Sequence, residues 1–290
     1  MIKEITAKTI LSSSKQPDPW FGIKYTMNLY RGCQHQCIYC DSRSECYQIE
    51  NLADILVKVN AIDLLRKELA SKRVIGTIST GSMNDPYMPL EATRHLTGQA
   101  LRVIAENRFP IHIITKSDLV LRDLDTLTQI SATYAAVSFT ITTADDALGK
   151  RIEPGASLVS NRFAAMKTLA ENNILTGVTM MPILPFIEDS EENVRAIVAQ
   201  AHANGARYIL AAFGMTLRDR QREYYYAQLD RLFPGLRARY ERAFGERYSA
   251  PANQARRLEK LFRELCDRYG IATHMPQYTP HKRMAQPSLF

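Results

Sequence analysis

The 290-residue sequence contains no apolar run of about 18 residues, the length that a membrane-spanning helix needs. Residues 1–5 show neither the apolar core nor the cleavage site of a secretion signal. Cysteine is also scarce. There are five cysteines, and three of them fall within eight residues, which suits a reducing compartment better than a framework of disulfides. We therefore expect a cytoplasmic protein with no membrane partner.

Acidic residues are fewer than basic ones. Asp and Glu total 30 against 37 for Lys and Arg, which gives a formal net charge of +7. The excess is concentrated in residues 205–270, where fourteen basic residues, thirteen of them arginine, accompany eight acidic ones. Most of the surplus charge therefore lies in this stretch. It permits a polyanionic partner such as nucleic acid without requiring one.

Segments typical of buried strands alternate with segments of helical periodicity, and the hydrophobic content of 46% is enough for a large core. We predict strands at 24–30, 74–79, 111–115, 134–141, 176–181 and 208–212, and helices at 53–69, 92–107, 119–131, 158–172 and 191–204. Such alternation indicates parallel βαβ units. About six units are too few for a closed eight-fold barrel, so we predict an α/β fold with a partial, TIM-like (β/α)6 barrel.

The alternation stops after Phe213. Helical patterns follow at 217–233, 235–244 and 253–269, and Gly270 is a typical helix stop signal. We divide the chain into an N-terminal arm, the barrel, a C-terminal helical extension and an irregular tail, at residues 1–23, 24–213, 214–270 and 271–290.

The most informative stretch has the spacing C-x3-C-x2-C, formed by Cys33, Cys37 and Cys40. Three thiolates in a tight loop can converge on one inorganic centre. A zinc site normally takes four protein ligands, and an iron–sulfur cube usually takes four cysteines. With three cysteines, one iron of a cube would stay open to bind a substrate or a cofactor.

These cysteines, with Tyr39 directly before the last one, resemble the signature of the radical S-adenosylmethionine (SAM) superfamily. The resemblance implies that Cys33, Cys37 and Cys40 hold a [4Fe-4S] cluster whose fourth iron binds the amino and carboxylate groups of SAM. It implies reductive cleavage of SAM to a 5′-deoxyadenosyl radical, an electron donor such as flavodoxin or ferredoxin, and the same partial barrel. A zinc knuckle and a redox-sensing loop are the alternative interpretations of the motif.

Functional side chains of α/β barrels gather at the carboxyl ends of the strands. Ser79, Thr80 and Gly81 end the second predicted strand, and Asp85 follows closely. The resemblance implies a glycine-containing motif here that contacts the amino group of SAM. The sequence differs from the commoner Gly-Gly-Glu, and an ordinary strand-to-helix loop is the alternative.

Three further candidate sites lie in or directly after the third and fourth predicted strands. Lys116 could pair with the carboxylate of SAM as a point charge, or be a solvated loop lysine. Ser138 and Thr140 share one face of a strand, and the resemblance gives this strand a role in contacting ribose hydroxyls; threonine also simply suits strands. Arg151 and Glu153 precede a proline, so we expect extended chain that directs both toward the cofactor, with a surface ion pair as the alternative.

The apolar segment 180–185 ends the fifth strand. We interpret it as core packing rather than as a wall for the adenine ring.

A wider pattern resembles the spore photoproduct lyase-like, or DNA repair photolyase-related, subgroup over about residues 20–213. The matching segments are 28–33, 40–41, 85–91 and 115–117. Spore photoproduct lyase also uses a cysteine near the second-strand loop to return a hydrogen atom to its substrate. No cysteine lies there in this chain, because the remaining two are Cys46 and Cys266. The resemblance thus supports the subgroup but not the lyase reaction, and it leaves the catalytic residues and the substrate unassigned.

Two features suggest partners. Arginines and tyrosines alternate at 218–226 and 237–242, a mixture that can bind nucleic acid through phosphates and base stacking, although a basic face over buried tyrosines explains it as well. The last five residues, from Gln286 to Phe290, resemble the peptides by which bacterial repair and replication proteins dock on the sliding clamp, and they could instead pack on the barrel.

The leading hypothesis is a radical SAM enzyme that abstracts hydrogen from an unidentified substrate, with nucleic acid as one candidate. The competing hypotheses are a nucleic-acid-binding module with a structural metal site and a redox sensor.

Overall fold

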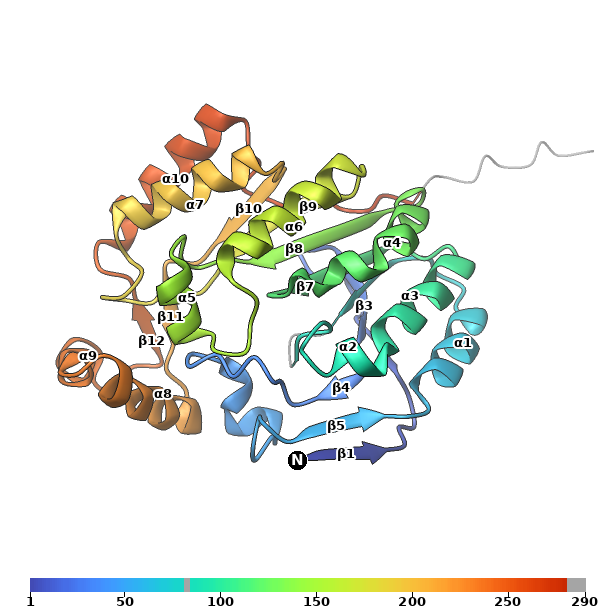
Figure 1. Ribbon diagram of the computed structural model, residues 1–290, viewed down its shortest axis with the longest axis horizontal. Coiled ribbons are helices and arrows are strands. Elements are labelled where there is room, and N and C mark those ends of the chain that lie inside the picture. Colours follow the sequence, from blue (N-terminus) through green and yellow to red (C-terminus); the bar gives the residue numbers. More distant parts are fainter. Residues whose placement is uncertain (81–83, 281–290) are drawn as a thin grey trace, which may run out of the picture.

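The computed structural model describes residues 1–80 and 84–280, so Gly81 and the segment from Gln286 to Phe290 lie outside the described residues. Within this part, helices surround the outer side of a curved sheet (Figure 1). The strands of the sheet follow the order β10-β9-β8-β7-β6-β3-β2. Their bounds are β2 Leu11–Ser13, β3 Ile23–Met27, β6 Thr77–Thr80, β7 Ile111–Thr115, β8 Ala135–Thr140, β9 Leu175–Met180 and β10 Tyr208–Ala211.

The sheet has the predicted parallel arrangement. Strands β3, β6, β7, β8, β9 and β10 pair in parallel, and β2 pairs antiparallel with β3. In the described part of the chain no pairing joins β10 to β2, so the barrel is open. Every residue of β8 is buried, as expected for a parallel strand covered on both faces. The structure therefore confirms the partial (β/α)6 barrel.

The barrel helices bury aliphatic side chains against the sheet. Leu65 and Leu69 of α1 and Leu101 and Ile104 of α3 are examples. His95, with a φ of 53°, divides the helix expected at 92–107 into α2 and α3. The helix bounds are α1 Ala61–Ser71, α2 Glu91–Arg94, α3 Leu96–Glu106, α4 Leu124–Ser131, α5 Asp146–Ile152, α6 Val159–Glu171 and α7 Glu191–Ala203.

A second, three-stranded sheet lies beside the cysteine loop and corrects two predictions. It has the order β1-β5-β4, with β1 at Ile2–Ile5, β5 at Ile55–Lys58 and β4 at Tyr30–Arg31. The helix predicted at 53–69 was wrong at its start, because Ile55 and Val57 alternate with half-buried neighbours as in a strand. The strand predicted at 24–30 likewise ends at Met27, and the chain then changes sheets before it reaches the cysteines.

The C-terminal extension is not wholly helical. Helices α8 (Asp219–Leu232) and α9 (Leu236–Phe244) accompany a two-stranded antiparallel sheet of β11 (Gly214–Thr216) and β12 (Ser249–Pro251). These strands are too short to show a periodicity in the sequence. The last helix, α10 (Ala255–Tyr269), lies along α7 on the barrel, where Arg257 pairs with Glu191 at 2.5 Å (Figure 1).

The amino-terminal end of the barrel is closed by the N-terminal arm and the residues after α10. Phe21 stacks on the ring of His112, with ring centres 4.8 Å apart, and Gln277 donates a hydrogen bond to the Pro19 carbonyl. The cavity described below therefore opens at the opposite end. No helix within residues 1–80 and 84–280 is both long and apolar enough to cross a bilayer.

Candidate cofactor site

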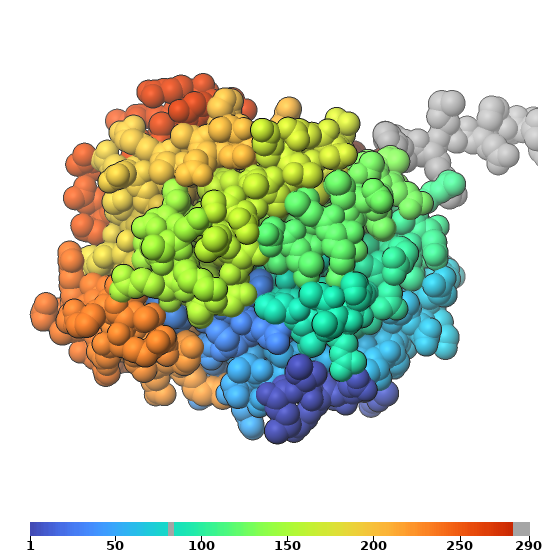
Figure 2. All heavy atoms as spheres, viewed as in Figure 1, coloured from blue at the N-terminus to red at the C-terminus, as the bar shows by residue number. Residues whose placement is uncertain are grey.

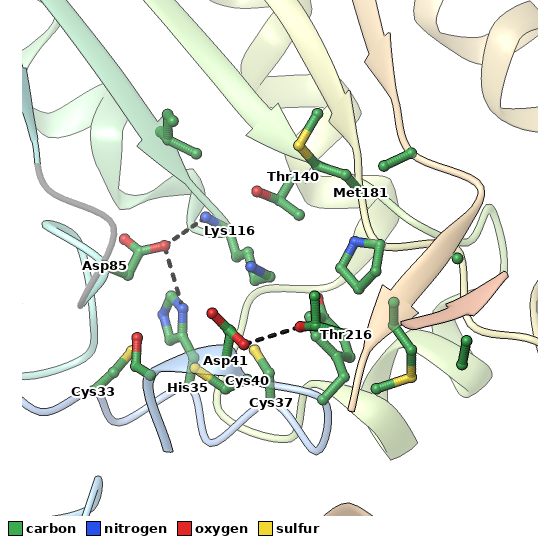
Figure 3. Close-up of a pocket in the computed structure, with 18 of the residues that line it drawn as sticks. Cys33, His35, Cys37, Cys40, Asp41, Asp85, Lys116, Thr140, Met181 and Thr216 are labelled. Atoms are coloured by element: carbon green, nitrogen blue, oxygen red, sulfur yellow. Dashed lines mark hydrogen bonds and ion pairs between the residues drawn. The ribbon is translucent and has the colours of Figure 1, made fainter. Parts of the chain in front are cut away.

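A cavity of about 700 Å³ lies at the carboxyl ends of the barrel strands (Figure 3). The cysteine loop, the ends of β7, β8 and β9, and the β11–β12 pair all contribute to it. The lining includes thiol, polar, charged and apolar side chains, among them Cys33, His35, Cys37, Tyr39, Cys40, Asp41, Tyr47, Asp85, Lys116, Thr140, Met181, Pro182, Met215 and Thr216. The cavity thus combines thiols and polar groups on one side with apolar side chains on the other.

The cysteine loop is fixed on both of its flanks. Gly32 precedes it with a φ of +88°, and a Cβ there would meet the carbonyl oxygen of Asp54 at 2.3 Å, so only glycine fits. The amide of Cys33 donates to the Leu52 carbonyl at 2.8 Å. On the other flank, the amide of Ile38 donates to the Ile152 carbonyl at 2.9 Å. These contacts orient the loop so that its three thiols line one cavity.

The three thiols are free to serve as ligands of a metal centre. None of the five cysteines forms a disulfide, and all lie in the described chain. Among the described residues, no three His, Cys, Asp or Glu side chains converge closely enough to hold one metal ion. Each thiolate of an iron–sulfur cube binds a different iron, so the ligands of a cube need not converge on one point. Three separate thiols on one cavity therefore fit the cube.

Burial favours the protonated form of Cys33 and Cys37. Burial, with a further contribution from Asp85, raises the pKa of Cys33 to about 12, and burial also raises the pKa of Cys37. Ligation requires the thiolate, so the binding of a metal centre here would release protons.

Lys116 supplies a positive charge to the cavity. Its ammonium group lies 5.7 Å from the centre of the Tyr39 ring, and among the described lining residues it is the only lysine or arginine. Burial by itself would lower the pKa of Lys116, but negative charge at Cys37 when that thiol is ionised, and at Glu153 and Asp85, outweighs burial and raises it. The group is therefore a cation suited to an anionic part of a ligand.

Asp85 joins three segments around the cavity. Its carboxylate accepts hydrogen bonds from the Thr115 hydroxyl and the Lys116 amide, both at 2.7 Å, and from the Tyr87 amide at 2.8 Å. Nδ1 of His35 lies 3.3 Å from Oδ2 (Figure 3). Burial would raise the pKa of Asp85, but His35 and these donors lower it to about 2. The carboxylate therefore links the second-strand loop, the end of β7 and the cysteine loop.

The hydroxyl residues predicted to contact the cofactor are placed differently from one another. Thr140 lines the cavity, and its Oγ1 lies 2.9 Å from Oγ1 of Thr179. Ser138, two residues earlier on β8, lies outside the lining, and its hydroxyl contacts His112 and Tyr208. Ser79 and Thr80 are buried at the end of β6 without lining the cavity, and Gly81 lies outside the described residues.

The extended chain predicted at Arg151 and Glu153 was wrong for Arg151. This residue belongs to the last turn of α5, is exposed, and donates to the Leu232 carbonyl while its guanidinium lies over Phe233. Glu153 instead turns inward, is 1% exposed, and accepts a hydrogen bond from the Tyr39 hydroxyl. Neither residue lines the cavity, but Glu153 contacts one that does.

Several lining residues were missed from the sequence. Asp41 follows Cys40 directly, and this adjacency is a local signal that could have identified it, whereas Tyr47 lies further along the chain. Met215 and Thr216 belong to β11, a strand too short to show a periodicity in the sequence. Met181, which we assigned to core packing, also faces the cavity.

Residues 27–198 match the family model of the radical SAM superfamily. The chain belongs to this superfamily. Membership makes the protein a radical SAM enzyme and implies that it uses SAM and an iron–sulfur cluster. The binding-module and redox-sensor hypotheses lose their support, because neither is a radical SAM enzyme.

Relatives by sequence include an uncharacterized protein of Methanocaldococcus jannaschii, 37% identical over 193 residues, which cover 66% of this chain and 70% of the relative. An uncharacterized protein of Mycobacterium tuberculosis is 28% identical over 264 residues, covering 87% and 77% of the two chains. The fold is similar to that of a spore photoproduct lyase mutant, with a TM-score of 0.70 at 18% identity, over 93% of this chain and 81% of that one. This likeness shows a shared fold that includes the extension.

Proposed function

We propose that the enzyme holds a [4Fe-4S] cluster on Cys33, Cys37 and Cys40, binds SAM in the adjoining cavity, and abstracts hydrogen from a substrate. The observation that carries this proposal is the presence of three free thiols on one cavity that also contains a buried cation and an apolar wall. The chemistry that the cluster and SAM supply when bound is reductive cleavage of the sulfonium, which yields a 5′-deoxyadenosyl radical.

The side chains around the cavity would bind and orient SAM. Lys116 would pair with its carboxylate, and Thr140 would contact a ribose hydroxyl. Ser79 and Thr80 do not line the cavity, so the prediction that this motif contacts the amino group of SAM rests on Gly81, which lies outside the described residues. Asp85 and Glu153 would act through their neighbours, because the contacts of Asp85 serve the loops and Glu153 holds Tyr39. Arg151 and Ser138 have other partners and would not touch the cofactor.

The apolar wall would exclude water from the reacting groups. Met181 and Pro182 come from the end of β9, and Met215, Ala250 and Pro251 come from the β11–β12 pair. A reactive radical needs such a dry site, because water and small solutes would otherwise quench it.

For the substrate we propose nucleic acid. The arginine excess of residues 205–270 supports this class. A relative in fold, a spore photoproduct lyase mutant of TM-score 0.69, was solved with a dinucleoside spore photoproduct bound. Base stacking on the extension would not involve Tyr225 or Tyr240, since both are buried and their hydroxyls lie 2.9 Å apart. Phosphate contacts made by the arginines would make binding sensitive to salt.

We propose two protein partners, an electron donor and the sliding clamp. Turnover requires a one-electron donor such as flavodoxin or ferredoxin. Docking on the sliding clamp through Gln286 to Phe290 is an independent proposal, and removal of these five residues should abolish binding to purified clamp without affecting the cluster.

The test is anaerobic reconstitution with iron and sulfide, followed by metal analysis and electron paramagnetic resonance (EPR) of the reduced protein. We expect about four iron atoms per chain and an EPR signal that changes when SAM is added, because SAM would bind the open iron. Cys33→Ala, Cys37→Ala and Cys40→Ala should each lose the cluster, and Cys266→Ser should keep it. A wild-type protein that takes up zinc instead, or whose signal ignores SAM, would contradict the proposal.

A further inference from the structure

Arg162 of α6 is a wholly buried cation that the sequence analysis did not identify. Only 1% of its surface is exposed, and its Nη1 lies 2.5 Å from Oε2 of Glu153. The guanidinium also donates to the carbonyl of Thr140 at 2.9 Å and to the carbonyl of Ser157 at 2.8 and 3.0 Å. A buried charge is strongly unfavourable unless it is paired and hydrogen-bonded, and here both conditions hold.

The contacts of Arg162 lead directly to the cysteine loop. Glu153, its ion-pair partner, accepts the hydrogen bond of the Tyr39 hydroxyl, and Tyr39 lies between Cys37 and Cys40 in the sequence. The backbone on either side of Glu153 binds the same loop, since the Ile152 carbonyl accepts from the Ile38 amide and the Gly155 amide donates to the His35 carbonyl. The buried ion pair of Arg162 and Glu153 thus connects the end of β8 to the loop that carries the three thiols.

Charged groups of both signs lie near the loop before any thiol ionises. Arg162 and Lys116 are the cations, and Glu153 and Asp85 are the anions. Burial would lower the pKa of Arg162, but the charge and the hydrogen bond of Glu153 raise it, so the guanidinium stays charged. Three thiolates would add negative charge at this place, and reduction of a cluster would add one more. A buried cation nearby would then favour the reduced state.

We infer that Arg162 is a positioning residue of the cofactor site, which fixes Tyr39 and the cysteine loop through Glu153 and raises the reduction potential of the cluster held there. This inference rests on the proposed function. Arg162 touches neither the cavity nor the proposed ligands of the cluster, so its effect would be indirect. Partners of this kind commonly change metal affinity by about 10- to 100-fold.

The test compares variants that separate charge from geometry. Arg162→Met removes the cation and leaves Glu153 unpaired. Glu153→Gln/Arg162→Met removes both charges, and it remains informative if Arg162→Met does not fold. Tyr39→Phe keeps the ion pair and breaks only its link to the loop. Leu169→Ala is the matched control, because Leu169 is a fully buried residue of the same helix two turns further on.

Each folded variant is reconstituted, and three quantities are measured: the midpoint potential by EPR-monitored titration, the EPR line shape, and the rate of iron loss to a chelator. We expect a more negative potential for Arg162→Met, and a return toward the wild-type potential in the double variant. Iron loss should be about tenfold faster in Tyr39→Phe and in the double variant than in Leu169→Ala.

The outcomes distinguish a failure of the proposed function from a failure of the inference about Arg162. If wild-type protein holds no [4Fe-4S] cluster, the proposed function fails and the inference fails with it. If wild-type protein holds the cluster, but the Arg162 and Tyr39 variants match Leu169→Ala in potential, line shape and iron loss, only the inference is overturned. Arg162 would then contribute to folding alone.

Discussion

Asp41, the residue after the third cysteine, accepts a hydrogen bond from Thr216, with Oδ1 and Oγ1 2.9 Å apart, although 175 residues separate the two in the chain (Figure 3). Nε of Arg218 lies 3.1 Å from the same carboxylate oxygen. The Gln221 side chain donates to the Tyr39 carbonyl at 3.2 Å. Figure 2 shows the blue segment after the cysteines against the orange extension. The extension is therefore attached directly to the cysteine loop and helps to form the candidate cofactor site.

The first prediction tests this attachment. Thr216→Val removes the hydroxyl that donates a hydrogen bond to Asp41 and keeps the shape of the side chain. We expect a loss of about 1 kcal/mol in the free energy of unfolding, measured with urea, because a partly buried acceptor loses its donor. Thr93→Val is the control, since Thr93 is exposed and its hydroxyl bonds only the nearby Leu90 carbonyl. Equal losses in both variants would show that the Asp41 contact contributes no more to the free energy of unfolding than the exposed Thr93 contact does.

The second prediction concerns Lys116. Lys116→Met keeps the length and the apolar stem of the side chain and removes its charge. We expect SAM to bind about 10- to 100-fold more weakly, because a charge-assisted hydrogen bond to the carboxylate contributes about 1.5–3 kcal/mol. Equilibrium binding of labelled SAM to the reconstituted protein measures the change.

The matched control for Lys116 is Lys150→Met, which removes an exposed lysine of α5 away from the cavity. Its affinity for SAM should equal that of the wild type. Unchanged affinity in Lys116→Met, with the iron content intact, would remove Lys116 from the cofactor site.

The third prediction is a pH dependence of stability that Glu188 causes. This carboxyl is 1% exposed, and its Oε2 accepts from the Leu184 amide at 3.0 Å. Burial raises the pKa of Glu188 from 4.5 to about 8. The folded protein therefore retains a proton that the unfolded chain releases, so this contribution to stability is complete below the unfolded pKa and is lost as the pH rises through about 8.

Glu188→Gln keeps an acceptor for the Leu184 amide and abolishes the ionisation. Its melting temperature should exceed that of the wild type at about pH 9 and match it at about pH 5, as measured by circular dichroism. Glu171→Gln, at an exposed position on α6, should melt like the wild type at both values. Parallel pH profiles of Glu188→Gln and wild type would contradict the assignment.

Residues that follow neighbouring strands could be placed from the sequence. The carboxyl ends of parallel strands meet at one edge, and the structure brings Asp85 to 2.7 Å from the Lys116 amide. The cysteine motif of Cys33, Cys37 and Cys40 could also be identified from the sequence, because its spacing is local.

Other features depend on contacts that a local pattern does not contain. Helix α5 turns Arg151 outward to Phe233, which the proline after Glu153 did not reveal. Thr216 reaches Asp41 only through the packing of the extension, and the strand that carries it is three residues long. Arg162 falls within a helix of ordinary periodicity, so its burial against Glu153 follows from tertiary structure alone.

Formation of 5′-deoxyadenosine would show directly that the protein cleaves SAM reductively. The wild-type protein, reconstituted anaerobically, is mixed with SAM and dithionite, with and without DNA, and the product is quantified by chromatography. We predict 5′-deoxyadenosine from wild type and Cys266→Ser and none from Cys33→Ala. Product from wild type no greater than from Cys33→Ala, in a protein that binds zinc instead of iron, would contradict the account.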